Sequence, residues 1–462
     1  MPIKSVQSVK PWQWRSLALN NRTASEIFAA LFLDSKIATL LESPGTVASE
    51  QPQLSRYSIC GGAPRKIQGE TRLWTPKREI LPFLRSLLKQ STTNLSEVAH
   101  LPFTGGWLGW LGYDLAWEIE KLPELNPDTL PFPVAYWYEP ECFAVLDHKL
   151  QILWLAGNDD RQLDNLEVKL ANPVKKTPPN TATTSAITFL TDRQQYQNTV
   201  KQAKKYIEAG DIFQTNLSLR FQTSTTNDSW SIYQQLQQIN PSPFASYWRS
   251  PWGDVISCSP ERLVQLEGNI AQTRPIAGTR RRGTDIKSDR ALAEELSADV
   301  KEQAEHIMLV DLERNDLGRV CQWGSVEVDE LLVIERYSHV MHLVSNVRGI
   351  LSSDRDAVDL IEGVFPGGTI TGCPKVRCME IIEELEPVRR SLFYGSCGYL
   401  DRRGNLDLNI LIRTLLYVKE DSNIAQVYGQ VGAGIVADSD PAREWFESLS
   451  KAEAQIAALK IQ

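Results

Sequence analysis

The stretch Ile212-Phe-Gln-Thr-Asn-Leu-Ser-Leu-Arg-Phe221 is the part of the sequence that most clearly predicts the fold. Apolar and polar residues alternate along it, as they do on a β-strand whose two faces meet different surroundings. One face carries the apolar side chains of Phe213, Leu217, Leu219 and Phe221. The other face carries the polar side chains of Gln214, Asn216 and Ser218. We therefore expect a strand over these residues.

A helix is predicted directly before this strand. Thr191 is a suitable N-cap and Gly210 a suitable end, and apolar residues recur between them at helical spacing, namely Tyr196, Val200, Ala203 and Ile207. Further strands are predicted at 252–257, 331–346, 395–400, 408–416 and 424–431, and helices at about 287–313, 374–386 and 441–459. Helices interspersed among antiparallel strands indicate an α+β fold class rather than a doubly wound sheet.

Composition excludes several classes of function. The chain has 462 residues, of which 42% are hydrophobic, as in ordinary globular proteins. Its net charge is −8 and it has no long Lys/Arg cluster, so no nucleic-acid partner is expected. No apolar run approaches the roughly 20 residues of a membrane span, and no signal peptide is recognisable. Seven cysteines without a Cys-x-x-Cys pair favour a reducing compartment, so we expect a cytoplasmic protein.

Two segments of the N-terminal part have a distinctive composition. Thr104-Gly-Gly-Trp-Leu-Gly-Trp-Leu-Gly-Tyr113 combines glycine with large aromatic residues, which predicts a close approach of neighbouring backbones. Residues 173–187 are rich in Pro, Thr, Asn and Lys and predict a linker or a long loop. This segment divides the chain into an N-terminal region, 1–172, and a C-terminal region, 188–462.

Two Glu-x-x-Glu pairs lie in predicted helices of the C-terminal region, and they are Glu302 with Glu305 and Glu444 with Glu447. Carboxylates three residues apart on a helix share a face and repel each other. Such pairs are common on solvated surfaces. Two of them, each beside apolar helix positions, also suit a hard cation that prefers oxygen ligands, most of all Mg²⁺.

Several other residues are candidates for binding an anion. Lys451 follows Glu444 and Glu447 on one helical stripe, and Gly432-Ala-Gly434 upstream is consistent with a turn whose N–H groups face a carboxylate. Arg413 lies between apolar residues of a predicted strand and needs an anionic partner, from either the protein or a ligand.

Acid–base candidates are fewer. Glu261 follows a predicted strand and would be a general acid if burial raised its pKa; otherwise it pairs with Arg262. His339 and His342 would face opposite sides of a strand, so they cannot chelate one metal ion. One of them can act as an acid–base group, and a structural role is equally consistent.

The order of the motifs resembles the chorismate-utilising enzymes, which include the large subunits of anthranilate synthase and aminodeoxychorismate synthase. The resemblance covers about 190–458 and is carried by these segments: Gly210-Asp-Ile-Phe-Gln214, Ser259-Pro-Glu261, Pro275-Ile-Ala-Gly-Thr279, Glu302–Asp316, Glu335-Arg-Tyr-Ser-His339, Phe365–Lys375, Gly432-Ala-Gly434 and Pro441–Glu447. The N-terminal region matches more loosely through Leu40-Leu-Glu-Ser43 and Arg56-Tyr-Ser58.

The resemblance implies a single α+β domain of two antiparallel sheets packed face to face, with helices outside. In it, 1–172 is an N-terminal region of the anthranilate synthase component I type packed on the core, and 188–462 is the chorismate-binding catalytic region. It implies chorismate as the substrate, with Mg²⁺ bound by Glu305 and Glu447 and supported by Glu302 and Glu444. Substrate carboxylates would be held by Tyr394, Arg413, Lys451 and the backbone of Gly432, Ala433 and Gly434.

The catalytic residues that the resemblance implies are Glu261, His339, Gln214, Ala277 and Thr369. Glu261 would protonate the departing C4 hydroxyl, and His339 would lie against the ring. Relatives that add water carry Lys where this chain has Gln214, which has no titratable group. Gln214 therefore favours ammonia as the nucleophile, supplied by a separate glutamine amidotransferase subunit.

Two ammonia-using enzymes fit, and we expect the large subunit of aminodeoxychorismate synthase, which makes the precursor of 4-aminobenzoate. Its support comes from Gln214-Thr-Asn216, Cys258–Leu263 and Gly395–Leu400. Ala277 instead matches anthranilate synthase component I, because the typical aminodeoxychorismate synthase has a nucleophilic Lys there. A non-catalytic chorismate-binding relative is the third alternative.

Overall fold

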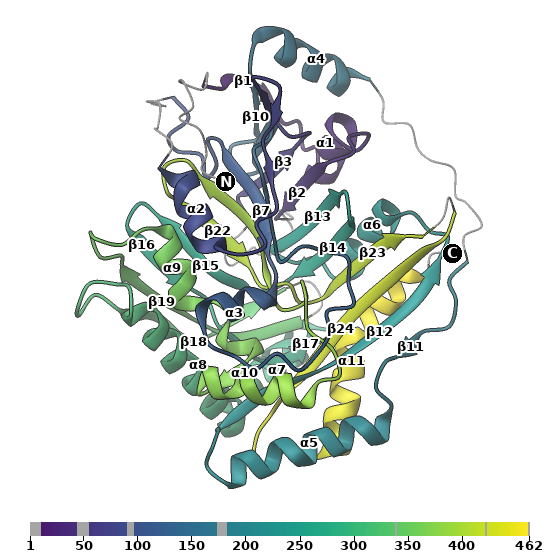
Figure 1. Cartoon of the computed structure of the whole chain (residues 1–462), viewed down its shortest axis with the longest axis vertical. Helices are drawn as coiled ribbons and strands as arrows, with labels where there is room; N and C mark the ends of the chain where they lie inside the picture. Colours follow the sequence, from purple (N-terminus) through teal and green to yellow (C-terminus); the bar gives the residue numbers. More distant parts are fainter. Residues whose placement is uncertain are drawn as a thin grey trace.

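A computed structural model describes residues 11–43, 55–89, 97–172, 183–337, 340–420 and 423–460. Two antiparallel sheets form its centre and helices lie around them (Figure 1). All strand pairings that the described residues make are antiparallel. The predicted α+β class with two facing antiparallel sheets is confirmed.

The first sheet contains twelve strands within the described ranges. Its order is β1 (Gln13–Ala18), β10 (Ile152–Gly157), β9 (Phe143–Asp147), β3 (Tyr57–Gly61), β2 (Ala38–Glu42), β13 (Phe244–Ser250), β14 (Gly253–Ser259), β23 (Thr414–Lys419), β24 (Ala425–Ile435), β12 (Gln214–Thr225) and β11 (Thr188–Phe189). The short strand β20 (Gly372–Cys373) also pairs with β12.

The second sheet has the order β17 (Ile276–Arg281), β19 (Val340–Ile350), β16 (Ile270–Thr273), β15 (Arg262–Glu267), β22 (Leu406–Asn409), β21 (Ser396–Asp401), β7 (Gly106–Leu111), β8 (Ala135–Tyr138) and β6 (Leu73–Trp74). Strand β18 (Glu327–Arg336) pairs with β19, and β4 (Lys66–Ile67) forms a separate hairpin with β5 (Glu70–Thr71). Strands from 1–172 and from 188–462 therefore share both sheets, as where β2 pairs with β13 and β7 with β21.

Helices cover the outer faces because each has an apolar stripe to bury. On the first sheet these are α1 (Ala24–Leu31), α4 (Asp160–Ala171), α5 (Arg193–Glu208), α6 (Ser229–Ile239) and α11 (Pro441–Leu459), which share one apolar core with it. On the second sheet side lie α2 (Ile80–Leu88), α7 (Ile286–Ala298), α8 (Val300–Gly318) and α9 (Ala357–Val364). A second core contains side chains from both sheets. The remaining helices are α3 (Ala116–Ile119), α10 (Lys375–Leu385) and the 3-10 turns η1 (Tyr113–Leu115) and η2 (Gly368–Ile370).

Two helix predictions need correction. The segment expected as one helix over 287–313 forms α7 and α8, which are separated at Asp299. The Asp299 side chain accepts hydrogen bonds from the backbone N–H groups of Lys301 and Glu302, so it starts a new helix. The N-cap of α5 is Asp192, which makes a capping box with Gln195, and not Thr191.

Two strand predictions were also wrong. The segment 331–346 belongs to the β18–β19 pair rather than to one strand, and Ser338 and His339 lie outside the described residues. The segment 408–416 is divided between β22 and β23, which belong to different sheets. Phe213 precedes β12 and is exposed, whereas the other predicted residues of the 212–221 stretch are buried on both strand faces.

Of the predicted linker 173–187, residues 173–182 lie outside the described residues. Within the described part of the chain, no helix is both long enough and apolar enough to cross a bilayer.

The chain passes between the two sheets at several points, and two of these passages lie next to each other. Ser259 ends β14 in the first sheet, and Arg262 starts β15 in the second. In the reverse direction, β22 leaves the second sheet and β23 enters the first. The crossings are joined where the Ile410 N–H donates to the Glu261 carbonyl at 3.0 Å and the Ser259 hydroxyl donates to the Ile410 carbonyl at 2.6 Å. Glu261 and Arg413 both lie at these crossings.

The predicted close backbone approach in the 104–113 segment is confirmed at Gly109. A Cβ atom at this position of β7 would lie 2.2 Å from the carbonyl oxygen of Tyr136 on β8. We expect Gly109→Ala to lower the free energy of unfolding by about 2–4 kcal/mol, because the strands must separate to admit the methyl group. Urea denaturation followed by tryptophan fluorescence measures this change.

The matched control is Gly318→Ala at the end of α8, where no atom lies within 4 Å of the added Cβ. It should be neutral or slightly stabilising, because alanine is the better helix former. Equal effects of the two substitutions would contradict the close packing at Gly109.

Candidate active site

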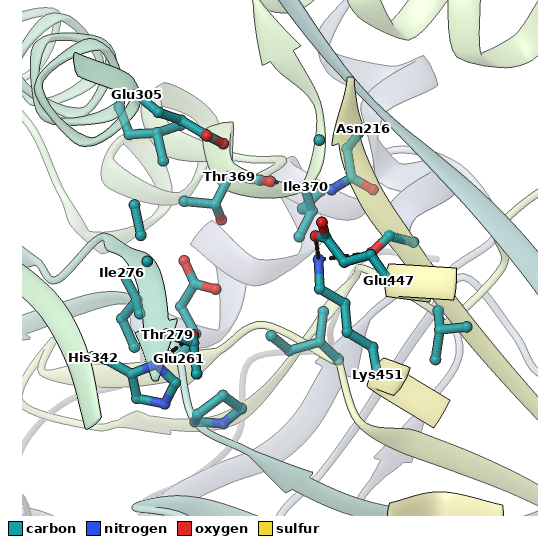
Figure 2. A pocket seen from close by; sticks show the side chains of 18 of the residues that line it. Asn216, Glu261, Ile276, Thr279, Glu305, His342, Thr369, Ile370, Glu447 and Lys451 are labelled. Atoms are coloured by element: carbon teal, nitrogen blue, oxygen red, sulfur yellow. Dashed lines mark hydrogen bonds and ion pairs between the residues drawn. The ribbon is translucent and has the colours of Figure 1, made fainter. Parts of the chain in front are cut away.

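A cavity of about 500 Å³ opens at the two crossings (Figure 2). Its walls come from β12, the β14–β15 crossing, β17, α8, the loop around η2, β24 and α11. Of the residues predicted as site residues, all line this cavity except Ala433 and His339. Ala433 is fully buried in the core under the helices of the first sheet, and His339 lies outside the described residues.

Four carboxylates from two helices face this cavity. Glu302 and Glu305 come from α8, and Glu444 and Glu447 come from α11. Figure 2 shows Glu305 and Glu447 entering from different sides. Burial raises the pKa of Glu305, and the charges of Glu302 and Glu447 raise it further. Burial likewise raises the pKa of Glu444, whose Oε2 is buried and has no hydrogen-bond partner within the described ranges.

These four carboxylates suit an oxygen-preferring cation in their chemistry. Within the described residues, however, no group of three or more Asp, Glu, His or Cys side chains is close enough together to hold a metal ion by itself. Arg280 pairs with Glu302 at 3.3 Å and Lys451 with Glu447 at 3.0 Å, whereas Glu305 and Glu444 have no ion-pair partner among the described residues. A cation that also takes oxygen ligands from a substrate or from water fits such a site. The magnesium ion therefore stays a prediction.

Lys451 interacts with one of these carboxylates. Its ammonium group lies 3.0 Å from a Glu447 carboxylate oxygen and donates to the carbonyl oxygen of Gly432 at 3.0 Å. Both side chains remain about half exposed. Lys451 is thus a cation at the cavity wall that a second anion can approach.

Glu261 is buried at the first crossing and is 6% exposed. Burial raises its pKa to about 7, while the Thr369 hydroxyl and the charges of Arg413 and Lys451 act in the opposite direction. Arg262 pairs with Asp407 at 2.9 Å, which rules out the alternative that Arg262 is the partner of Glu261. A carboxyl group that remains protonated near neutral pH is suited to donate a proton.

Arg413 lies at the second crossing, in the segment between β22 and β23, and not inside a strand as expected. It has a left-handed backbone conformation with φ of 49°. Its guanidinium donates to the Asn240 side-chain oxygen at 3.0 Å, and burial lowers its pKa. Among the described residues, no carboxylate lies within ion-pair distance of it. A partly buried guanidinium without a protein anion has the chemistry to receive a ligand anion.

Tyr394 is the second candidate for binding a ligand carboxylate. Its phenol oxygen is buried and lacks a hydrogen-bond partner within the parts of the chain described. Its backbone also adopts a positive φ of 64°. Burial keeps the phenol protonated by raising its pKa well above the usual value, so it can donate to an anion.

The segment Gly432-Ala-Gly434 is part of strand β24, not the predicted turn. It pairs with β12, where Gly434 lies opposite Asn216 and Gly432 opposite Ser218. A Cβ on Gly432 would lie 2.5 Å from the Leu217 carbonyl oxygen and 3.0 Å from the Tyr394 phenol oxygen. The absence of side chains here leaves the cavity open.

Gln214 begins β12 and reaches the metal-ligand candidates. Its amide nitrogen donates to Glu305 at 3.3 Å, and its amide oxygen is buried without a partner in the described residues. Ala277 lines the cavity from β17, directly before a bulge at Gly278 whose φ is 69°. The methyl group of Ala277 offers no nucleophile.

His342 also lines the cavity, and the prediction of His339 overlooked it. It lies on β19, where its Nδ1 shares a hydrogen bond of 2.9 Å with the Thr279 hydroxyl. Burial lowers its pKa to about 3, so the ring is neutral at neutral pH. The two histidines were expected on opposite faces of a strand, and this was the signal that only one of them would face the site. Asn216 and Gln430 line the cavity as well and were not predicted as site residues.

A second cavity, of about 110 Å³, lies at the other end of the first crossing. Leu41, Glu42 and Ser43 line it together with Pro243 and Phe244. The Ser43 hydroxyl donates to the Pro243 carbonyl at 2.5 Å, which brings the N-terminal and C-terminal regions together here.

Comparison with known proteins places this site in a family. Residues 44–457 match the family model described as chorismate binding enzyme. The chain is 62% identical to an "Anthranilate synthase component I-like protein" of Synechocystis sp., over 98% of this chain and 93% of that protein. It is 44% identical to "Aminodeoxychorismate synthase component 1" of Bacillus subtilis, over 90% of this chain and 92% of that protein.

Two further comparisons extend this result. The chain is 42% identical to "Anthranilate synthase component 1" of the same Synechocystis strain, over 78% of this chain and 77% of that protein. The crystal structure of anthranilate synthase component I from Streptococcus pneumoniae has a TM-score of 0.75 and 31% identity, over 87% of this chain and 92% of that one. The chain belongs to the chorismate binding enzyme family.

The raised pKa of Glu261 predicts that activity and stability both fall as pH rises, whereas removing its charge should affect the two oppositely. A general acid must be protonated, so kcat/KM should fall as pH rises above about 7. The folded-state pKa lies above the unfolded value of about 4.3, so stability is greatest below the unfolded value and is lost as pH rises through the folded value. We expect Glu261→Gln to reduce kcat by about 10²–10⁴-fold.

The same substitution should stabilise the protein at pH 8 by up to about 3 kcal/mol and have little effect at pH 5. Thermal melts of both proteins across this pH range measure the difference. A substitution that stabilises equally at both pH values would contradict the assigned protonation of Glu261.

Proposed function

We propose that this protein aminates chorismate with ammonia, as the large subunit of an aminodeoxychorismate synthase. The observation that carries the proposal is Gln214, whose buried neutral amide lies beside Glu305. The chorismate-utilising enzymes that add water have Lys at this position. An amide cannot remove a proton from water, whereas ammonia needs no such base.

The charged groups of the cavity suit the substrate. Chorismate carries two carboxylates, and Arg413, Tyr394 and Lys451 are the groups that can receive them. Tyr394 is a buried donor without a partner in the described residues, and Arg413 is a partly buried cation that no described carboxylate pairs with, so both favour an anionic ligand over water. These residues bind and orient the ring.

The reaction exchanges the C4 hydroxyl of chorismate for an amine. Glu261 donates a proton to the departing hydroxyl, so that the C4–O bond breaks and water leaves. Ammonia supplies the electron pair for the new C–N bond, and a proton from the resulting ammonium restores Glu261. Ala277 cannot form a covalent intermediate, so ammonia attacks the substrate directly.

Magnesium is part of the same proposal. Glu305 and Glu447 would hold the ion, with Glu302 and Glu444 supporting it through water. When bound, the ion supplies positive charge to a substrate carboxylate. The protein's own contribution is to present these carboxylates from α8 and α11 to one cavity.

The relatives support this choice of product. The relative at 62% identity and a separate anthranilate synthase component at 42% identity come from one organism. The more similar of the two is therefore a second member of the family in that organism. The Bacillus subtilis relative that matches almost the full length is named for aminodeoxychorismate synthase. Ammonia would come from a glutamine amidotransferase subunit, as the component names of these relatives suggest.

Anthranilate synthase component I is the second candidate, and Ala277 is the observation that favours it. In that reaction ammonia attacks C2 directly, and pyruvate is then lost with formation of anthranilate. No lysine nucleophile is required. A non-catalytic chorismate-binding relative is the remaining alternative, and the complete set of cavity carboxylates argues against it.

Incubation of the purified chain with chorismate, Mg²⁺ and an ammonium salt separates these alternatives. We expect a product that forms 4-aminobenzoate and pyruvate only after an aminodeoxychorismate lyase is added, as measured by liquid chromatography. Anthranilate fluorescence and pyruvate release without the lyase would identify the second candidate. Chorismate binding without any turnover would identify the third, and Glu261→Gln serves as the inactive control.

The metal assignment predicts a specific loss in Glu447→Gln. Because one negatively charged ligand is removed, the Mg²⁺ concentration for half-maximal activity should rise at least about tenfold. Calorimetric titration of Mg²⁺ in the presence of chorismate gives an independent measure. The control is Glu453→Gln, an exposed position on the same helix that does not line the cavity. An unchanged Mg²⁺ dependence of Glu447→Gln would remove Glu447 from the metal site.

A further inference from the structure

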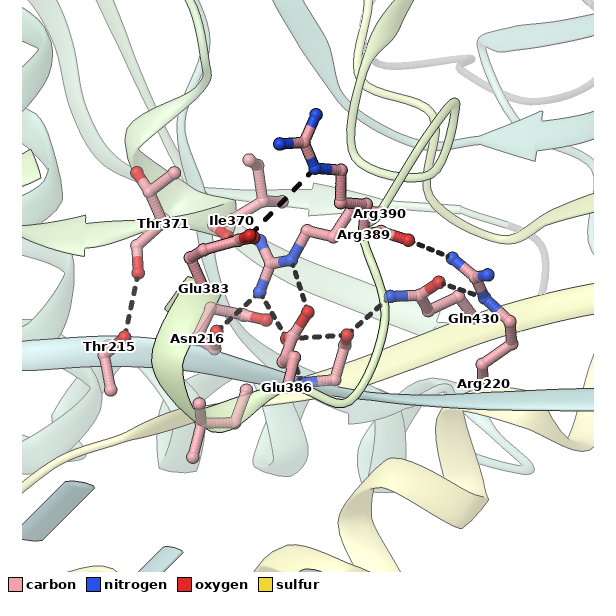
Figure 3. Close-up of polar contacts among 12 residues, drawn as sticks. Thr215, Asn216, Arg220, Ile370, Thr371, Glu383, Glu386, Arg389, Arg390 and Gln430 are labelled. Carbon is pink, nitrogen blue, oxygen red and sulfur yellow. Dashed lines mark hydrogen bonds and ion pairs between the residues drawn. The ribbon is translucent and has the colours of Figure 1, made fainter. Parts of the chain in front are cut away.

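Arg390 is a fully buried arginine directly behind the cavity, and its side chain is 1% exposed. It follows α10 in the chain and does not itself line the cavity. Figure 3 shows it at the centre of a group of polar contacts. A buried guanidinium is costly unless its charge and its five N–H groups are satisfied, so its contacts show what it holds in place.

Three contacts of Arg390 reach three different walls of the cavity. One terminal nitrogen donates to the Ile370 carbonyl at 2.7 Å, and the other donates to the Asn216 carbonyl at 2.8 Å. The guanidinium carbon lies 4.6 Å from the ring centre of Tyr394. Asn216, Ile370 and Tyr394 all line the cavity, and they come from β12, the η2 loop and the segment before β21.

The opposite side of the guanidinium is held by Glu386. Its carboxylate accepts from Arg390 Nε at 3.0 Å and from a terminal nitrogen at 2.7 Å. The same carboxylate accepts from the Ser218 N–H at 2.8 Å and from its hydroxyl at 2.7 Å. Arg390 and Glu386 therefore form a paired, two-point contact that is anchored to β12.

A chain of hydrogen bonds continues from this pair to a fourth wall. The Gln430 side chain donates to the Ser218 hydroxyl at 2.6 Å, and Arg220 donates to the Gln430 side-chain oxygen at 2.9 Å. Gln430 lines the cavity from β24. The polar group behind the cavity thus contacts four lining residues, namely Asn216, Ile370, Tyr394 and Gln430.

Tyr394 is buried in the core that contains side chains from both sheets, and the Arg390 guanidinium contacts its ring there. Its hydroxyl has no hydrogen-bond partner within the described residues, and its backbone has a φ of 64° that non-glycine residues rarely adopt. The face of its ring rests on the Arg390 cation, which is an attractive arrangement. Tyr113 lies against the same guanidinium at 4.8 Å.

We propose that Arg390 is a positioning residue for substrate binding, which acts by holding the Tyr394 phenol and the backbone of Asn216 and Ile370 in one arrangement around the ligand. The inference rests on the proposed function for the identity of the ligand, an anionic ring compound such as chorismate. Arg390 does not touch the ligand. Lysine cannot replace it, because an ammonium group lacks the planar fork that reaches two carbonyls and a carboxylate at once.

The test is a double-substitution cycle with direct binding of chorismate as the readout. Arg390→Lys, Tyr394→Phe and the double variant are titrated with chorismate and Mg²⁺ in a calorimeter, and kcat and KM are measured with an ammonium salt. We expect each single substitution to weaken binding about tenfold, which is the effect of losing one hydrogen bond to a charged group. We expect the double variant to bind within about twofold of the weaker single one, because both changes remove the same interaction.

The matched control is Arg389→Lys, the neighbouring residue. Its guanidinium stacks on Trp117 at 4.6 Å and lies 4.0 Å from Glu383, away from the cavity walls. Binding should stay within about twofold of wild type for this control. For Arg390→Lys the change should appear in KM more than in kcat, since Glu261 is left in place.

Glu386→Gln is a second variant that tests the role of Arg390, and it is used if Arg390→Lys does not fold. It preserves shape and removes the charge that holds Arg390, so we expect binding to weaken about threefold in the otherwise unchanged protein. The same substitution should have no further effect when combined with Tyr394→Phe.

The outcomes distinguish a failure of the proposed function from a failure of the role of Arg390. If the wild-type protein does not bind chorismate, the proposed function fails. If wild type binds it and a folded Arg390→Lys binds equally well, the role of Arg390 fails. Additive losses in the double variants, from either Arg390→Lys or Glu386→Gln, would also overturn it, because the effect would then not pass through Tyr394.

Discussion

The paired crossings between the two sheets are the constraint on which the rest of the structure depends. One crossing leaves β14 at Ser259 and the other enters β23 at Thr414, and the strands on either side pair with each other. The cavity lies at these two crossings, with Glu261 from one and Arg413 from the other among its lining residues. The same crossings carry the buried acid Glu261 and the partly buried cation Arg413 into that cavity. The two crossings therefore position both the cavity and two of its charged residues.

Charge is distributed around this cavity in a way that leaves both signs incompletely balanced. The carboxylates of α8 and α11 repel one another, and Arg413 has no ion-pair partner within the described ranges. A protein selected for stability alone would pair or remove such groups. Their retention is explained if a cation and an anionic ligand complete the site together. Polar groups behind the walls, such as Arg390 with Glu386, are by contrast fully paired.

Local patterns in the sequence predicted the helix over 441–459 and the α+β class correctly, because an N-cap, a first-turn proline and an apolar stripe act within a few residues. Features that depend on distant partners were not predictable. Asp299 divides a helix that looked continuous, and the glycines at 432 and 434 lie in a strand that pairs with β12. The conformation of Arg413 depends on the sheet crossing. The site residues themselves came from motifs, whereas Arg390 was not predicted, because two of its contacts are to the backbone carbonyls of Ile370 and Asn216, which are distant in sequence.

The pairing of β12 with β24 joins residues that are about 220 positions apart, as between Thr215 and Ile435. On the ribosome, β12 therefore emerges long before its neighbour is synthesised. Its edge toward β24 stays unpaired until the last tenth of the polypeptide has been made, and α11 follows only after that. Long-range strand pairing of this kind is slow and exposes unpaired strand edges during synthesis. A nascent or C-terminally shortened chain should thus lack a substrate cavity altogether and depend on chaperones for protection from aggregation.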